Sequence, residues 1–130
     1  MHLIEPYSAD KVNIKKILKE TTQFDQIPGI LGFIITSTDG MPIVSTLSSQ
    51  IDELKISGLI AALLPSSEVA IEEMNKGKMD YIYFKWTEGY FLAMRAGSDA
   101  ILSVLTEKNA RIGIILLVMR RVCDKIAQIL

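Results

Sequence analysis

Side chains that carry acid–base or metal chemistry are scarce in this sequence. The only histidine is His2, beside the N-terminus, so the usual general base at neutral pH is missing from the body of the chain. The only cysteine, Cys123, falls on the apolar stripe of a predicted helix, with no histidine placed to activate it. This position favours a buried structural thiol over a nucleophile. The sequence therefore predicts no catalytic residue and no metal site.

Acidic, basic and glycine-rich motifs do not form a reactive set either. Glu68 and Glu72 share one face of a predicted helix and Glu73 points elsewhere, which is typical of a solvated surface. Neither GxxxxGK[ST] nor GxGxxG occurs, so no phosphate-binding loop and no cofactor is predicted. The four arginines that could act on a partner's phosphoryl group are Arg95, Arg111, Arg120 and Arg121. Nothing in the sequence distinguishes one of them, and surface or packing roles are favoured.

Length and composition indicate a single domain that shares part of its apolar surface with a partner. The chain has 130 residues, 14 basic and 15 acidic side chains and a net charge of −1, which gives no electrostatic reason to expect nucleic acid. Hydrophobic residues make up 49% of it, and the mean hydropathy is +0.30. A chain this apolar either buries its surface very efficiently or covers part of it with another molecule. We favour the second interpretation.

The expected location is the cytoplasm. No apolar run reaches the roughly 18 residues that span a bilayer, and the N-terminus lacks the basic start and apolar segment of a signal peptide. A single cysteine also excludes an internal disulfide. We expect residues 1–8 to be an N-terminal tail and residues 9–130 to form the domain.

The stretch from Ile27 to Thr46 predicts a β-hairpin. Residues 31–36 and 41–46 have strand composition, and Asp39-Gly40 between them is a strong turn signal. Pro42 has no N–H for a ladder, so the second strand is expected at an edge of the sheet.

Helices are predicted before and after the strands. Ser8 is the expected cap of a helix over residues 9–24, and its lysines, Lys11, Lys15, Lys16 and Lys19, are interpreted as a solvated side rather than a phosphate site. Asn109 is the expected cap of a last helix that runs to Leu130. The apolar stripe of this helix is wider than one face over its first two turns, so we expect that part to be buried on more than one side.

A long helix over residues 50–75 contains a run of small residues. Ser49 with Asp52 resembles a capping box at its start. The small residues are Ser57, Gly58, Ala61 and Ala62. They suit either packing on the domain's own sheet or close helix–helix contact across a dimer, and the sequence alone leaves both open. Pro65 predicts a kink, or a break with recapping at Ser66 or Ser67.

Three strands joined by short turns follow, over residues 79–86, 90–96 and 100–106. The first of them carries large apolar or aromatic side chains on both faces, Tyr81, Tyr83 and Trp86 among them. One face must cover the core, and the other needs a cover from the long helix or from a second subunit. If this strand lies at the edge of the sheet, its free N–H and C=O groups also invite a partner strand.

The predicted order is α-β-β-α-β-β-β-α. It fits an α/β (α+β) fold with a single five-stranded antiparallel-rich sheet and helices on both faces.

This organisation resembles the Roadblock family of dynein light chains and small-GTPase regulators. The resemblance rests on IPGILGFIITSTDGMPI, the small-residue helix after it, GYFLAMRAGSDAILSVLT and ARIGIILLVMRRV, and it covers residues 12–130. It implies the strand order second, first, fifth, fourth, third, with the long helix on one face and the other two helices on the opposite face. Pro65 departs from the usual uninterrupted second helix.

The resemblance also implies a function. Family members typically dimerise through the third strand and the second helix, and the platform so formed commonly binds Ras-like small GTPases without chemistry of its own. We therefore expect a non-enzymatic homodimer, or a heterodimer with a related subunit, that scaffolds or regulates such a GTPase. The expected dimer-interface residues are Ser57, Gly58, Ala61, Ala62, Tyr81, Tyr83 and Lys85. The alternative is a small-molecule sensor or a longin- or profilin-like adaptor that does not act on a GTPase.

Overall fold

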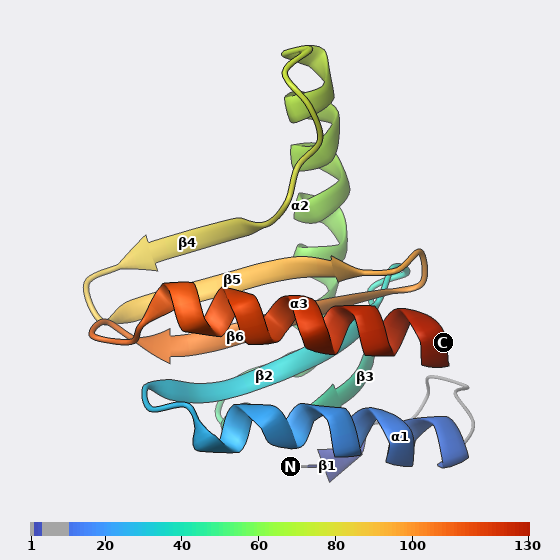
Figure 1. Ribbon diagram of the computed structural model, residues 1–130, viewed down its shortest axis with the longest axis vertical. Coiled ribbons are helices and arrows are strands. Elements are labelled where there is room, and N and C mark those ends of the chain that lie inside the picture. The colour runs from blue at the N-terminus through green and yellow to red at the C-terminus, as the bar shows by residue number, and fades with distance from the viewer. Residues whose placement is uncertain (1, 4–10) are drawn as a thin grey trace.

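A computed structural model of the chain describes residues 2–3 and 11–130, arranged as one antiparallel sheet between two layers of helix (Figure 1). The helices are α1 (Lys11–Thr21), α2 (Glu53–Glu73) and α3 (Ile112–Ile129), with a short 3-10 helix, η1 (Thr22–Gln26), after α1. The strands are β1 (His2–Leu3), β2 (Ile30–Ser37), β3 (Pro42–Ser45), β4 (Ile82–Trp86), β5 (Gly89–Ala96) and β6 (Ala100–Glu107).

The five predicted strands form the sheet in the order β3-β2-β6-β5-β4, and every neighbouring pair is antiparallel. This is the order that the family resemblance implies, so the predicted fold class is confirmed. At the hairpin, Gly40 has φ +91, and its N–H donates to the carbonyl of Ser37 at 3.0 Å, as the Asp39-Gly40 turn signal predicts.

The two faces of the sheet bury separate cores. In Figure 1, α1 and α3 lie side by side in front of the sheet and α2 crosses behind it. On the front face, Ile17 of α1 and Ile115 and Met119 of α3 pack against Leu92 and Val104. On the rear face, Ile60 and Leu64 of α2 pack against Ala93 and Ile101, which is a much smaller core.

Pro42 does not lie on a bare edge strand. β1 pairs with β3 through His2↔Ser45 and Leu3↔Val44, so a sixth, two-residue strand covers part of β3. Pro42 itself pairs with Thr36 of β2. Two residues of the predicted tail thus form a strand. Ser8, the predicted cap, and the expected start of the first helix lie outside the described residues.

Several element boundaries differ from the prediction. The predicted helix over residues 9–24 ends earlier as an α-helix, at Thr21, and continues as 3-10 turns. The N-cap of α3 is Arg111 rather than Asn109, and it makes no side-chain cap hydrogen bond. β4 begins at Ile82 rather than at residue 79, because residues 74–81 return from α2 without regular structure.

The C-terminal half of α2 projects beyond the sheet. Figure 1 shows it rising well past β4, accompanied only by the returning coil. The protruding half therefore has no sheet of its own chain beneath it.

Candidate partner-binding surface

The start of α2 is fixed by a side-chain cap. The carboxylate of Asp52 accepts a hydrogen bond from the backbone N–H of Lys55 at 3.1 Å, which satisfies one of the free donors at the helix N-terminus. Asp52 is thus the cap, and Ser49 lies outside the helix. This corrects the predicted Ser49–Asp52 capping box.

Pro65 lies inside α2 without breaking it. The helix runs unbroken from Glu53 to Glu73, although Pro65 has no N–H to donate to the carbonyl of Ala61. The next carbonyl along, that of Ala62, accepts a hydrogen bond from the hydroxyl of Ser66 at 2.9 Å. Ser66 therefore supports the helix at the proline rather than starting a new one.

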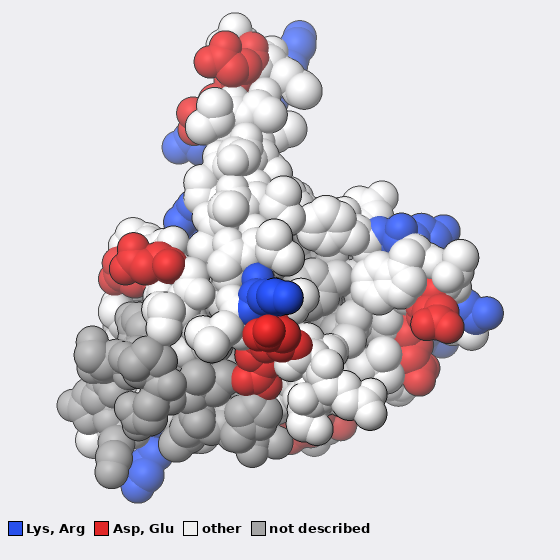
Figure 2. All heavy atoms as spheres, turned by 180° about the vertical axis from the view of Figure 1, so that it is seen from behind, with Lys and Arg blue, Asp and Glu red and all other residues white. Residues whose placement is uncertain are grey.

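Only a narrow stripe of α2 is buried in its own subunit. Ser57, Ile60 and Leu64 face the sheet and are less than 4% exposed. Four large apolar side chains on the remaining faces stay open to solvent, Leu54, Leu59, Leu63 and Val69, and their exposed fractions run from 40% to 58%. Figure 2, seen from the α2 side, shows a mostly uncharged surface that continues from the helix onto the body of the domain.

The predicted small-residue set divides between these two surfaces. Ser57 is fully buried against its own sheet, so it cannot line a dimer interface in this conformation of the subunit. Ala61 is half-buried beside the β2–β3 turn, where a Cβ built on Gly40 would lie 3.6 Å from the Ala61 methyl group. Gly58 and Ala62 are exposed. The sequence could not separate these positions, because all four residues are small and adjacent on the helix.

β4 forms a free edge of the sheet. It pairs with β5 on one side, and no described strand pairs with its other side. All of its residues except Ile82 are exposed, including Tyr83 and Lys85. Its outer N–H and C=O groups are thus available to another strand.

The side chains of β4 alternate between the two faces of the sheet, and the pairing with β5 shows which face each side chain occupies. Tyr83 pairs with Leu92 of the front core, and Phe84 pairs with Phe91 beside the rear core. Tyr81 and Tyr83 therefore lie on the α3 side, with ring centroids 6.3 Å apart. Lys85 is on that side too, its ammonium 5.8 Å from the Tyr90 ring centroid. Tyr81 is half-buried just before the strand.

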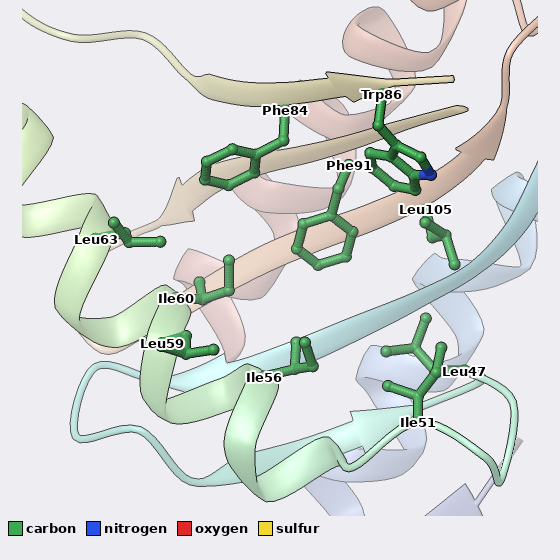
Figure 3. Close-up of a pocket in the computed structure, with 10 residues that line it drawn as sticks. All are labelled: Leu47, Ile51, Ile56, Leu59, Ile60, Leu63, Phe84, Trp86, Phe91 and Leu105. Atoms are coloured by element: carbon green, nitrogen blue, oxygen red, sulfur yellow. The ribbon is translucent and has the colours of Figure 1, made fainter. Parts of the chain in front are cut away.

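The α2 side of β4 holds an apolar groove that sequence reasoning did not identify. The groove has a volume of about 340 Å³ and separates α2 from β4 and β5 (Figure 3). Its aromatic wall is formed by Phe84, Trp86 and Phe91, and Phe84 and Trp86 are each 42% exposed. The opposite wall comes from the N-terminal half of α2 and the segment before it, and consists of Leu47, Ile51, Ile56, Leu59, Ile60 and Leu63, with Leu105 between the walls. The alternation of large side chains along residues 82–86 was the sequence signal that could have indicated this groove.

An ion pair joins α2 to the sheet at the end of this surface. The guanidinium of Arg95 on β5 donates to both carboxylate oxygens of Glu68, at 2.9 and 2.5 Å. These hydrogen bonds raise the pKa of Arg95 above its usual value. Glu68 is therefore ion-paired and partly buried, rather than fully solvated as predicted. The ion pair holds α2 at the point where the helix leaves the sheet.

A second ion pair lies beside β4 on the opposite face. Arg120 of α3 binds the carboxylate of Asp80 through two guanidinium nitrogens, and both side chains are about half exposed. The hydrogen bonds from Arg120 lower the pKa of Asp80 below its ordinary value. This pair ties the coil before β4 to the front helix layer.

The described residues offer neither a metal-ligating cluster nor an activated thiol. Among them, no three His, Cys, Asp or Glu side chains gather where a metal ion would be held. Burial raises the pKa of the Cys123 thiol to about 12, which disfavours the reactive thiolate.

α2 is also long and apolar enough, by length and composition, to cross a membrane, which no other described helix is. The prediction that the chain has no such segment was based only on the length of uninterrupted apolar runs. Insertion would carry the Glu68–Arg95 ion pair and the adjoining open sheet edge into hydrocarbon, where unpaired backbone groups and charges are costly. A protein cover suits this surface better.

Comparison with solved structures identifies the same fold. The gliding protein MglB of Thermus thermophilus superposes with a TM-score of 0.80, at 11% identity and 97% coverage of both chains. MglB of Myxococcus xanthus gives a TM-score of 0.78 at 14% identity, covering 97% of this chain and 93% of that one. A Roadblock/LC7 domain from Streptomyces avermitilis gives 0.74 at 16% identity, with 83% and 91% coverage.

Sequence comparison agrees with the structural one. An uncharacterised protein of Methanocaldococcus jannaschii is 28% identical over 104 residues, covering 80% of this chain and 90% of that relative. The Roadblock/LC7 domain profile matches residues 17–106, from α1 to the end of β6. The chain therefore belongs to the Roadblock/LC7 domain family.

Proposed function

We propose that this protein is a non-enzymatic, dimeric binding module that scaffolds or regulates a Ras-like small GTPase. The observation that carries the proposal is the continuous uncovered surface formed by the outer faces of α2 and the free edge of β4. Large apolar side chains that remain 40% or more exposed over such an area are typical of an interaction site.

A second copy of the chain suits this surface because its parts complement one another. A free edge strand can pair with its own copy about a two-fold axis, which extends the sheet across both subunits. The protruding half of α2 then reaches over the partner, and its exposed Val69 and Met74 have an apolar groove to meet there. Exposed Gly58 and Ala62 permit close approach of the two helices. Of the predicted dimer-interface residues, the proposed interface, or seam, retains Gly58, Ala62, Tyr83 and Lys85. Half-buried Ala61 and Tyr81 lie at its margin, and Ser57 is left out.

A small-molecule sensor is the weaker alternative. Ligand sites generally combine apolar walls with a few polar groups that orient the ligand. The groove beside β4 is lined by apolar residues alone, so it has nothing to orient a small polar ligand. Apolar side chains of a protein partner fit it better.

The GTPase enters the proposal through the family. Roadblock relatives commonly present such a platform to Ras-like GTPases, and this chain offers no catalytic group of its own in the described region. Any effect on GTP hydrolysis or nucleotide exchange would then arise by repositioning groups that belong to the GTPase.

The test is capture of the organism's Ras-like GTPases by immobilised full-length chain, with each GTPase loaded in turn with GTP or GDP. We expect one of them to be retained in a nucleotide-dependent manner. Ala62→Glu should reduce retention by disrupting the seam. The control, Ser98→Glu, adds the same side chain in the exposed β5–β6 turn and should not. Retention of no GTPase in either nucleotide state contradicts the proposal.

A further inference from the structure

The helix layer on the front of the sheet has a charge opposite to that of the rest of the chain. Residues 11–21 and 111–129, which form α1 and α3 with its cap, carry eight basic and two acidic side chains, a net charge of +6. The whole chain has a net charge of −1. Residues 52–73, which form α2 with its cap, carry five acidic side chains and one basic one. Charge is thus separated between the two sides of the sheet.

The cations of the front layer point away from the core. Ile14 and Ile17 of α1 are buried against the sheet, and Lys15, Lys16 and Lys19 on its other side are all exposed. On α3, the exposed cations are Arg111, Arg120, Arg121 and Lys125. Since α1 and α3 lie side by side (Figure 1), these side chains form one broad basic face.

Most of this positive charge is not neutralised by the described residues. In the described part of the chain, Arg120 alone among these cations forms an ion pair, with Asp80. The two acidic side chains of the layer, Glu20 and Asp124, form none. Lys15, Lys16, Lys19, Arg111, Arg121 and Lys125 form no ion pair with a described residue, so they can meet an external negative charge.

Two apolar side chains stand within the basic face. Ile114 is 47% exposed and Leu117 is 51% exposed, on the outer side of the first two turns of α3. The sequence predicts burial of these turns on more than one side, but the subunit covers only the inner side. The basic face is therefore amphipathic, with its apolar groups next to Arg111 and Arg121.

We propose that the α1–α3 face binds the surface of an anionic lipid membrane. Clustered Lys and Arg side chains are attracted to anionic headgroups, each strengthening binding about fivefold, and apolar groups among them enter the headgroup boundary. A nucleic acid would leave Ile114 and Leu117 facing phosphates. Neither α1 nor α3 carries an aromatic side chain on which bases could stack. A membrane satisfies both kinds of group at once.

This orientation leaves the α2–β4 surface free, because α2 lies on the opposite face of the sheet and β4 lies at its edge. The inference stands without the GTPase. Pairing of two β4 edges would place both basic faces on the same side of a continuous sheet, and so would raise the avidity for a membrane.

The test is flotation of the full-length chain with vesicles of phosphatidylcholine alone and of phosphatidylcholine mixed with phosphatidylglycerol. We expect binding to the mixed vesicles only, and its loss toward about 1 M salt, where screening shortens the electrostatic range to about 3 Å. The double variant Lys16→Glu/Lys19→Glu should bind the mixed vesicles at least about 25-fold more weakly. The control, Lys76→Glu/Lys78→Glu, makes the same charge change in the exposed coil after α2 and should bind like the original chain.

Leu117→Gln tests the apolar contribution separately, since it should weaken binding at every salt concentration without changing the salt dependence. Equal binding to neutral and anionic vesicles contradicts the inference, as does an equal loss in both double variants. Binding of heparin or DNA without binding of vesicles would also overturn it. None of these results bears on capture of a GTPase.

Discussion

At the scale of single residues, the proposed binding function depends on which way a side chain faces rather than on its reactivity. Ser57 and Ala62 are similar in size and lie on the same helix, yet one is fully buried and the other is exposed. Trp86 and Lys85 are adjacent on β4 and serve opposite faces of the sheet. Of the first pair only Ala62 can contact a partner, and the two β4 side chains would contact it on different faces of the sheet.

The Asp80–Arg120 ion pair gives a pH dependence of known sign. Because the folded-state pKa of Asp80 is lowered, the pair stabilises the fold above the ordinary aspartate pKa of about 3.9, and the stabilisation disappears as the pH falls through the lowered value. Asp80→Asn should therefore reduce the Tm slightly at about pH 7, and the reduction should become smaller as the pH falls below the ordinary aspartate pKa. The reduction is small because both side chains are about half exposed.

The control for Asp80 is Asp99→Asn, which removes an exposed carboxylate that has no ion pair among the described residues. Its effect on Tm should not follow the Asp80 titration. A Tm difference for Asp80→Asn that stays constant from neutral to acid pH would mean that the pair does not stabilise the fold.

The sequence predicts the conformation and burial of a residue where the local pattern of residues decides them. The turn at Gly40, the apolar stripe of α3 and the burial of Cys123 follow from local pattern, and the structure has all three. The groove between Phe84 and Leu59 does not, because it depends on the angle at which α2 crosses the sheet. The cap at Arg111 was missed because Asn109 has the better cap chemistry but lies in the preceding turn.

At the scale of elements, α2 is the unusual part of the domain. It is 21 residues long, it protrudes beyond the sheet, and it contains Pro65. The sequence predicts its existence and most of its length, yet leaves its continuity at Pro65 open. Tertiary packing of Ile60 and Leu64 on one side of the proline and the Glu68–Arg95 ion pair on the other hold it as one helix.

Pro65→Ala should stabilise the domain. The substitution restores an N–H that can donate to the carbonyl of Ala61 and removes the ring, so the free energy of unfolding should rise by about 1 kcal/mol or more. Urea unfolding at one fixed protein concentration measures this, since dimerisation makes stability depend on concentration. Ser66→Ala, which removes the exposed hydroxyl bond to Ala62, is the control and should cost less than about 1 kcal/mol. A less stable Pro65→Ala chain would mean that the proline fixes a helix shape on which the fold depends.

At the scale of the whole molecule, the sheet separates two surfaces with different properties. One side presents α2 with its acidic side chains, exposed apolar residues and the groove, and the other presents the basic layer of α1 and α3. The architecture and strand order could be predicted from the sequence, because the order of elements, the short turns and the family resemblance constrain them together. The charge separation was not predicted, although the resemblance places the first and last helices on one face. The lysines of α1 were interpreted as an ordinary solvated side, and nothing in the sequence distinguished the arginines of α3.

Assembly of two copies across α2 and β4 can be tested by measuring the mass of the full-length chain in solution. Light scattering at micromolar concentration should give twice the mass of one chain. Ala62→Glu should give the mass of a single folded chain, since the new carboxylate would lie unpaired between the two helices, while Ser98→Glu should remain dimeric. A single-chain mass for the unaltered protein at that concentration would contradict the account.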